Sequence, residues 1–200
     1  MNELQTYPPP TRPDYRTRRL APLLINRLRD FPVIVLTGPR QAGKTTMLRN
    51  EPALADFTFL DLDDLQLRAR LALDPDLAWQ GHRHLVIDEV HRLPILLEAL
   101  KSRVDRDRAG TRVVVTGSAN LLLMRDVAES LAGRAAYLEL PPFAHGEWRR
   151  LPRPPLLEAL LAGELPAEGA HPCPAPAEVI VRGLLPPCLQ ANDPVAWWDA

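Results

Sequence analysis

The sequence predicts an α/β protein in which a mainly parallel, five-stranded β-sheet lies between two layers of helices. Short apolar runs rich in β-branched residues alternate with segments of helical spacing, as expected for strands that are buried on both faces. One run leads into a glycine-rich loop and then a helix-compatible segment, and a later run is followed directly by two adjacent acids. The expected strands are residues 33–36, 57–60, 84–87, 112–116 and 135–140.

Composition is that of an ordinary soluble globular protein, with 46% apolar and 24% charged residues in a chain of 200. A net charge of −1 disfavours, without excluding, a nucleic-acid partner. No apolar run approaches the length of a membrane span and the N-terminus lacks a signal-peptide core, so we expect no membrane partner and a cytoplasmic location. Cys173 and Cys188 predict neither a disulfide framework nor a zinc site.

The first predicted helix covers residues 16–29, where Leu20, Leu23, Leu24 and Leu28 recur at helical spacing. Arginines lie between these leucines. They fit either a nucleic-acid contact or a solvated helix face, and the pattern favours the solvated face.

The strand at 33–36 leads into the pattern G-x-x-x-x-G-K-[ST], in the strand–loop–helix setting that the P-loop motif requires. Glycines at the two ends of the loop allow its N–H groups to converge on an anion, and the helix that follows adds the positive end of its dipole. This setting disfavours a chance glycine-rich turn. Lys44 is then expected to reach the β- and γ-phosphates and Thr45 to bind Mg²⁺. The predicted nucleotide-binding residues are Gly38, Pro39, Arg40, Gln41, Ala42, Gly43, Lys44, Thr45 and Thr46.

The strand at 57–60 ends in an acidic cluster, and residues 65–73 are predicted to form a helix that stops at Asp74-Pro75. The strand at 84–87 runs directly into Asp88 and Glu89, which is the Walker B arrangement. Asp88 is expected to hold Mg²⁺ through its water shell, and Glu89 to act as the general base. The alternative is an acidic strand end with no chemical task, which the presence of the P-loop disfavours.

A helix beginning at Pro94 presents Leu96, Leu100 and Val104 on one face. The strand at 112–116 is followed by a polar tip, in which Ser118 and Asn120 are candidates to sense the γ-phosphate or the attacking water. A plain turn is the alternative for this tip.

A helix at 121–131 precedes Gly133 and Arg134, and the fifth strand follows. Arg134 fits two interpretations equally: an arginine finger, in cis or from a neighbouring subunit, or a cation near a helix C-terminus. Beyond Pro141 the pattern is weaker, with short elements expected at 156–161 and 179–185 around a Pro-rich linker.

The combined motifs resemble one branch of the AAA-type P-loop ATPases, whose ATP-binding core is followed by a C-terminal domain of unknown function. The resemblance rests on FPVIVLTGPRQAGKTT, FLDLDD, LVIDEVHRLPILLEALKSRVD, VVVTGSANLLLMRDVAESLAGR and LELPPF, over residues 16–148. It implies an AAA/ASCE-type three-layer αβα sandwich in which the sensor strand separates the Walker B strand from the P-loop strand. It also implies the roles given above for Lys44, Thr45, Asp88, Glu89 and Ser118 or Asn120.

Three segments are therefore expected: a Pro-rich lead-in at 1–15, an AAA-type ATP-binding domain at 16–150, and a Pro-rich linker with the start of a C-terminal domain at 151–200. The leading functional hypothesis is a Mg²⁺-dependent ATPase that couples ATP binding and hydrolysis to a conformational change. The alternatives are a nucleotide-dependent binding switch with little turnover and, less favoured, a DExH-type nucleic-acid motor. ATP is preferred over GTP because an N-K-x-D motif is absent. A protein partner or a homo-oligomer is left open.

Overall fold

A computed structural model of the chain describes residues 15–117, 131–150, 161–163 and 184–190. The chain divides into two compact units, Met1–Pro141 and Pro142–Ala200, each with its own elements. Among the described residues, no helix is long and apolar enough to cross a membrane.

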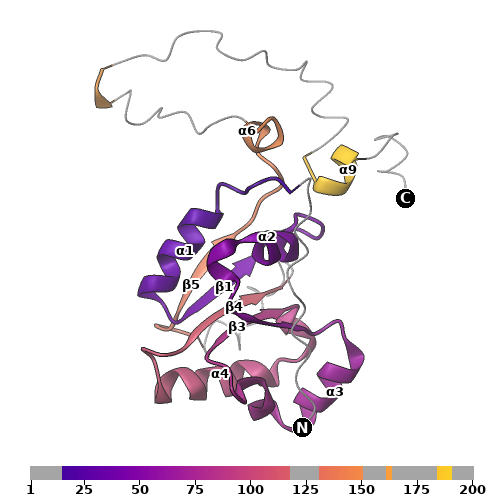
Figure 1. Cartoon of the computed structure of the whole chain (residues 1–200), viewed down its shortest axis with the longest axis vertical. Coiled ribbons are helices and arrows are strands. Elements are labelled where there is room, and N and C mark those ends of the chain that lie inside the picture. The colour runs from indigo at the N-terminus through magenta and orange to yellow at the C-terminus, as the bar shows by residue number, and fades with distance from the viewer. Residues whose placement is uncertain (1–14, 118–130, 151–160, 164–183, 191–200) are drawn as a thin grey trace. The chain divides into compact units, whose positions relative to one another are not determined.

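The first unit is an α/β domain built on a five-stranded sheet (Figure 1). Every strand pairing in the sheet is parallel, and the strand order is β2-β3-β4-β1-β5. The predicted fold class is therefore confirmed, and β4 separates β3 from β1 as the resemblance implied. The strands are β1 (Val33–Thr37), β2 (Thr58–Asp61), β3 (His84–Asp88), β4 (Arg112–Thr116) and β5 (Ala135–Glu139).

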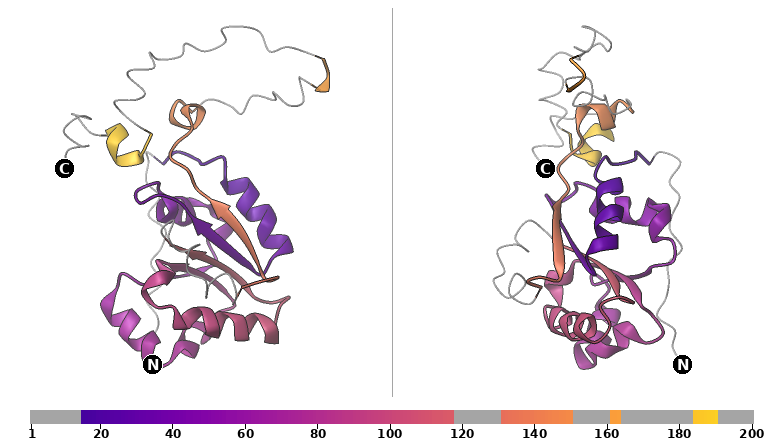
Figure 2. Two further views of the ribbon diagram at one scale, coloured as in Figure 1. Left: turned by 180° about the vertical axis from the view of Figure 1, so that it is seen from behind. Right: turned by 90° about the vertical axis from the view of Figure 1, so that its left-hand side faces the viewer.

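Helices cover both faces of this sheet (Figure 2). Alternating residues of β1 point to opposite faces, so Ile34 and Leu36 pack with α1 (Ala21–Asp30) and α2 (Lys44–Asn50). Val33 and Val35 belong to the other core, with α3 (Leu65–Leu73) and α4 (Ile95–Arg106). All five residues of β1 are buried, which explains why this strand reads as a continuous apolar run. Three 3₁₀ helices complete the described connections: η1 (Pro52–Leu54), η2 (Pro75–Trp79) and η3 (Val90–Arg92).

The boundaries agree closely with the sequence predictions, with one clear correction. Each strand lies within one residue of its expected bounds, and α3 spans the predicted residues. The first helix, however, begins at Ala21 and not at Arg16. Pro22 lies in its first turn, where the missing N–H costs nothing. A helix that began five residues earlier, at Arg16, would place the proline ring against a helical carbonyl.

In the second unit the structure describes two short helices, α6 (His145–Trp148) and α9 (Pro186–Gln190). The backbone N–H of Phe143 donates to the carbonyl of Leu184 at 2.8 Å, which joins the segments that precede them. Neither of these two helices was predicted. Most of the elements expected at 156–161 and 179–185, and most of the helix expected at 121–131, lie outside the described residues.

Candidate functional site

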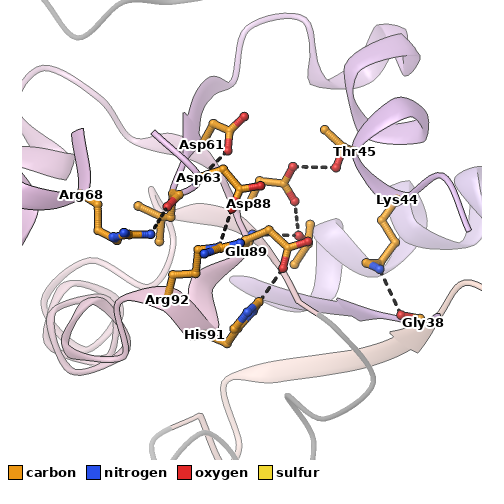
Figure 3. A network of polar contacts seen from close by, with 12 residues as sticks. Gly38, Lys44, Thr45, Asp61, Asp63, Arg68, Asp88, Glu89, His91 and Arg92 are labelled. Carbon is orange, nitrogen blue, oxygen red and sulfur yellow. Dashed lines mark hydrogen bonds and ion pairs between the residues drawn. The ribbon is translucent and has the colours of Figure 1, made fainter. Parts of the chain in front are cut away.

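The carboxyl edge of the sheet brings together four polar residues that the sequence singled out: Lys44, Thr45, Asp88 and Glu89. Because the strands are parallel, the loops that follow β1, β3 and β4 leave at the same edge, and these three strands are neighbours. Figure 3 shows the resulting cluster, with Lys44 and Thr45 approaching from α2 while Asp88 and Glu89 approach from the end of β3.

The loop after β1 has a backbone that depends on glycine. Gly38 has φ of +140°, and a Cβ placed on it would lie 2.2 Å from the carbonyl oxygen of Leu140. Gly43, with φ of +90°, is the residue from which α2 starts. Gln41 also has a left-handed conformation, with φ of +64°. Three positive-φ residues within six positions give the tight turn that directs backbone N–H groups inward.

Lys44 is buried, with 6% of its surface exposed. Its Nζ donates to the carbonyl oxygens of Gly38 and Pro39, each at 3.0 Å (Figure 3 draws the first). Burial lowers the pKa of Lys44 below the usual value of 10.5, an effect that the carboxylates of Glu89 and Asp88 oppose. The ammonium group therefore lies in the loop with no anion bound directly to it among the described residues.

The Asp88 carboxylate is held on both of its oxygens. The Thr45 hydroxyl donates to Oδ2 at 2.6 Å, and the Thr116 hydroxyl donates to Oδ1. Asp88 is 3% exposed, so this arrangement fixes a buried acidic group next to the first turn of α2. Hydroxyl and carboxylate oxygens at such a position are ligands of the kind that Mg²⁺ prefers.

Glu89 begins the connection after β3 in a left-handed conformation, with φ of +55° and ψ of +44°. Its backbone N–H donates to the Thr116 hydroxyl at 3.2 Å, so one threonine contacts both acidic residues. The Glu89 carboxylate oxygen Oε2 lies 3.1 Å from Nδ1 of His91, a contact that becomes an ion pair when the imidazole is protonated. About a quarter of the Glu89 side chain (27%) is exposed, which leaves the carboxylate accessible to solvent.

The acidic cluster that follows β2 supports this edge through ion pairs. Asp61 pairs with Asp88 in the sheet register and accepts from Arg49 of α2 at 3.4 Å. Asp63 forms an ion pair with Arg92 of η3. Asp64 accepts hydrogen bonds from the first turn of α3 and is its N-cap. The three acids therefore tie α2, η3 and α3 to the end of β2.

Arg18 is the least expected member of the site. It is 2% exposed, and its two terminal nitrogens donate to the carbonyls of Ala42 and Pro141, each at 2.7 Å. Ala42 lies inside the glycine-rich loop and Pro141 follows β5. A buried guanidinium therefore braces the loop against the segment that leaves the sheet.

The predicted residues differ in where the structure places them. Those of the loop and of the start of α2 lie together at the carboxyl edge with Asp88 and Glu89; they are Gly38, Pro39, Arg40, Gln41, Ala42, Gly43, Lys44, Thr45 and Thr46. Ser118 and Asn120 lie outside the described residues. Arg40 is exposed. The carbonyl of Thr46 accepts from the Asn50 side chain at 2.7 Å.

Arg134 lies at the opposite edge of the sheet. Its carbonyl accepts from the N–H of Val33, the first residue of β1, whereas the glycine-rich loop follows the last residue. A strand of that length separates the two edges by about 16 Å. The guanidinium of Arg134 binds Asp105 at 2.7 and 2.9 Å, and this contact holds the pKa of Asp105 below its usual value. The geometry therefore gives no support to a finger in cis.

Sequence reasoning missed three residues that contribute to the site: Thr116, His91 and Arg18. Thr116 is the last residue of β4, which lies between β1 and β3. Once this strand order is known, a hydroxyl at the end of β4 is expected to reach the residues that follow β3. His91 lies two residues beyond Glu89, close enough in sequence to be weighed as its neighbour. Nothing local marks Arg18, because its carbonyl partners lie 24 and 123 residues away along the chain.

Comparison with known proteins gives a family match and several relatives. Residues 30–148, more than half of the chain, match a family described as an AAA domain. Uncharacterised proteins of Mycobacterium bovis and Mycobacterium tuberculosis are each 40% identical to the chain over 135 residues, which cover 62% of this chain and 30% of the relative. The chain thus spans about a third of the length of these curated relatives.

Solved structures show the same fold at low identity. A Walker-type ATPase from Pyrococcus abyssi is 16% identical with a TM-score of 0.57, over 91% of this chain and 67% of that chain. AMPPCP-bound DnaA from Aquifex aeolicus is 13% identical with a TM-score of 0.53, over 86% of this chain and 58% of that chain. At these identities the likeness extends to the fold alone.

Proposed function

Because this chain belongs to the AAA domain family, we propose that it binds ATP with Mg²⁺ at the carboxyl edge of the sheet and hydrolyses it slowly. The observation that carries the proposal is the pairing of the Thr45 hydroxyl with the Asp88 carboxylate, 2.6 Å apart, beside the buried Lys44. The loop suits the phosphates of a nucleoside triphosphate, and the oxygens of Thr45 and Asp88 at the same edge suit its metal ion.

The loop fits a phosphate group. Lys44 is a buried cation whose Nζ donates to two carbonyls, which satisfies two of its three hydrogens. Burial disfavours the charged form, and a phosphate oxygen near Nζ would favour it. Arg18 holds the Ala42 carbonyl at the back of the loop, which fixes the loop backbone before any ligand arrives.

The donor set at Asp88 fits Mg²⁺. Magnesium keeps several waters and is bound in nucleotide sites by one or two protein oxygens together with phosphates. Thr45 and Asp88 are the two residues that would hold it. When bound, Mg²⁺ neutralises charge on the β- and γ-phosphates. Thr116 keeps Asp88 oriented with its second carboxylate oxygen engaged.

Glu89 is the candidate general base. Its carboxylate is partly exposed at the site and its backbone N–H is fixed by Thr116, so the side chain leaves the strand in a defined direction. General-base catalysis of this kind contributes about 10²–10⁴-fold to a rate. Nδ1 of His91 lies 3.1 Å from the carboxylate on one side, without a hydrogen bond among the described residues.

A switch with negligible turnover is the second candidate, and one observation favours it. Arg134 is occupied by Asp105 at the amino edge, so it does not supply a finger to the site of its own chain. A site that no arginine finger reaches loses about 10³–10⁵ in turnover. Under this alternative the chain binds ATP and changes conformation without useful hydrolysis until a second subunit or partner supplies the missing cation.

The partner and the biological output belong to the same proposal. The chain spans about a third of the length of its mycobacterial relatives, and we propose that ATP turnover is coupled to a conformational change of a larger protein. A second copy of the chain or an unidentified protein would receive that change, and a cytoplasmic location suits both.

The test is ATP binding and phosphate release by the purified chain, beside Lys44→Ala and Glu89→Gln. We expect wild-type turnover on the order of 10⁻³ s⁻¹ in the absence of an arginine finger. Lys44→Ala is expected to weaken ATP binding about 100-fold, since it removes a charged donor from a buried site. Glu89→Gln is expected to bind ATP normally and to lose turnover.

The chain offers a matched control because it has two lysines, Lys44 and Lys101. Lys101 lies on α4, and Lys101→Ala should leave binding and turnover unchanged. Tight binding with no turnover in wild type would favour the switch. Failure of wild type to bind ATP, or equal loss in the two lysine variants, would contradict the proposal.

A further inference from the structure

A polar pocket lies between η2 and α4, outside the site described above. Its volume is about 190 Å³. The lining side chains are mostly hydrogen-bond donors; they are Asp76, Trp79, Gln80, Ser102, Arg103 and Arg106.

The pocket belongs to the opposite end of the sheet from the glycine-rich loop. Helix η2 leads into the start of β3, and the last turn of α4 leads into the start of β4. The starts of parallel strands share one edge, and the glycine-rich loop follows the end of β1 at the other. A ligand in this pocket is therefore separate from a nucleotide bound at the loop.

The charge of the pocket is positive. Arg103 and Arg106 are three residues apart on α4 and so share a face. Within the described part of the chain, neither side chain has a hydrogen bond or ion pair. Asp76 and the carboxyl end of α4 both oppose an anion. Two full positive charges still exceed one negative charge and a partial one.

The decisive feature is a buried donor with no acceptor. Trp79 is 7% exposed and packs in the core beneath α4, yet its indole Nε1 has no partner among the described residues. The Nε atom of Arg103 is buried without a partner in the same way. Buried polar groups normally find a partner, and each exception calls for an explanation such as an absent ion. Both residues line the pocket, so an acceptor oxygen that enters it lies beside both side chains.

We propose that this pocket binds an oxyanion, a phosphate or carboxylate group, between the two guanidinium groups and the Trp79 indole N–H. Guanidinium groups recognise both kinds of oxyanion through paired N–H donors. The volume suits the anionic group itself, because pockets for whole drug-sized ligands are about 300–1,000 Å³. The ligand is then either a free ion or the charged end of a larger molecule, and the inference does not depend on ATP binding.

The test follows the indole N–H resonance of Trp79 by NMR in the full-length chain, assigned by its loss in Trp79→Phe. The four tryptophans give few such signals, so overlap is small. Inorganic phosphate, acetate and chloride are titrated at matched ionic strength. We expect a saturable shift with phosphate or acetate but not with chloride. Arg103→Ala or Arg106→Ala should weaken binding about tenfold.

Arg29→Ala, on the exposed face of α1, is the charge-matched control and should leave the titration unchanged. Tighter phosphate binding would identify a phosphate group, whereas equal or tighter acetate binding would identify a carboxylate such as an acidic side chain of a partner. The proposal is overturned if phosphate and acetate move the resonance no more than chloride does. It is also overturned if the shift persists in the double variant that combines Arg103→Ala and Arg106→Ala. A shift lost in Lys44→Ala but kept in the arginine variants would also overturn it.

Discussion

Thr116→Val tests whether one hydroxyl organises both acidic residues of the site. The substitution keeps the shape of the side chain and removes the Oγ1 that donates to Asp88 and accepts from the N–H of Glu89. Thr116 is fully buried, so water does not replace these contacts without rearrangement. A hydrogen bond to a charged group contributes about 1.5–3 kcal/mol and a neutral one about 1 kcal/mol. A buried methyl recovers about 1 kcal/mol.

The net loss in the free energy of unfolding is therefore about 1.5–3 kcal/mol, measured by urea denaturation without nucleotide. In the ATPase assay, turnover is expected to fall at least about tenfold while ATP binding changes less, because Glu89 and Asp88 lose their common anchor. Thr111→Val is the matched control. Thr111 is as buried as Thr116, but its hydroxyl has no partner among the described residues. That substitution should be neutral or stabilising. Equal stability and equal turnover of the two valine variants would refute the reasoning.

Three further predictions address other contacts. Gly38→Ala should abolish ATP binding and destabilise the fold, because its Cβ would lie 2.2 Å from the Leu140 carbonyl oxygen at φ of +140°; a binding titration and a thermal melt measure both effects. Arg18→Met should lower the free energy of unfolding by about 2–4 kcal/mol in urea, since it leaves two carbonyls unpaired, and should weaken ATP binding because the Ala42 carbonyl in the glycine-rich loop loses its donor. Asp105 has a pKa lowered by Arg134, so the pair stabilises the fold above the ordinary carboxyl pKa of about 3.8, and this contribution is lost as pH falls through the folded-state value. The acid limb of a stability–pH curve should therefore be flatter in Asp105→Asn than in wild type.

The fold was largely predictable because its signals are local. Buried parallel strands read as apolar runs, and Asp64 and Pro75 mark the two ends of α3. The lead-in to α1 was mispredicted because leucine spacing continues N-terminal to Pro22 while backbone geometry does not. The order of the strands came from the family resemblance and not from the spacing of residues.

Site residues were predictable from the sequence only where they belong to a motif whose strand lies at the centre of the sheet. Lys44, Thr45 and Asp88 follow from two motifs whose strands become neighbours of β4. Arg18 escaped because a buried arginine looks like any other arginine in an amphipathic segment until its distant carbonyl partners are known. Arg134 was ambiguous for a related reason: the sequence places it before a strand, but only the sheet shows that the start of that strand lies at the opposite edge from the glycine-rich loop.

The backbone at Glu89 adds an argument for its role. A non-glycine residue in the left-handed region is uncommon and costs about 1–2 kcal/mol, and glycine would remove that cost. The conformation is held by the hydrogen bond from the Glu89 N–H to Thr116 and by the turn into η3. The backbone at this position favours glycine, yet the residue is glutamate. We infer that the carboxylate has a function that compensates for the backbone strain. If so, Glu89→Gly should raise the stability of the chain, or leave it unchanged, while turnover is lost. A loss of stability together with unchanged turnover would instead make Glu89 a structural residue.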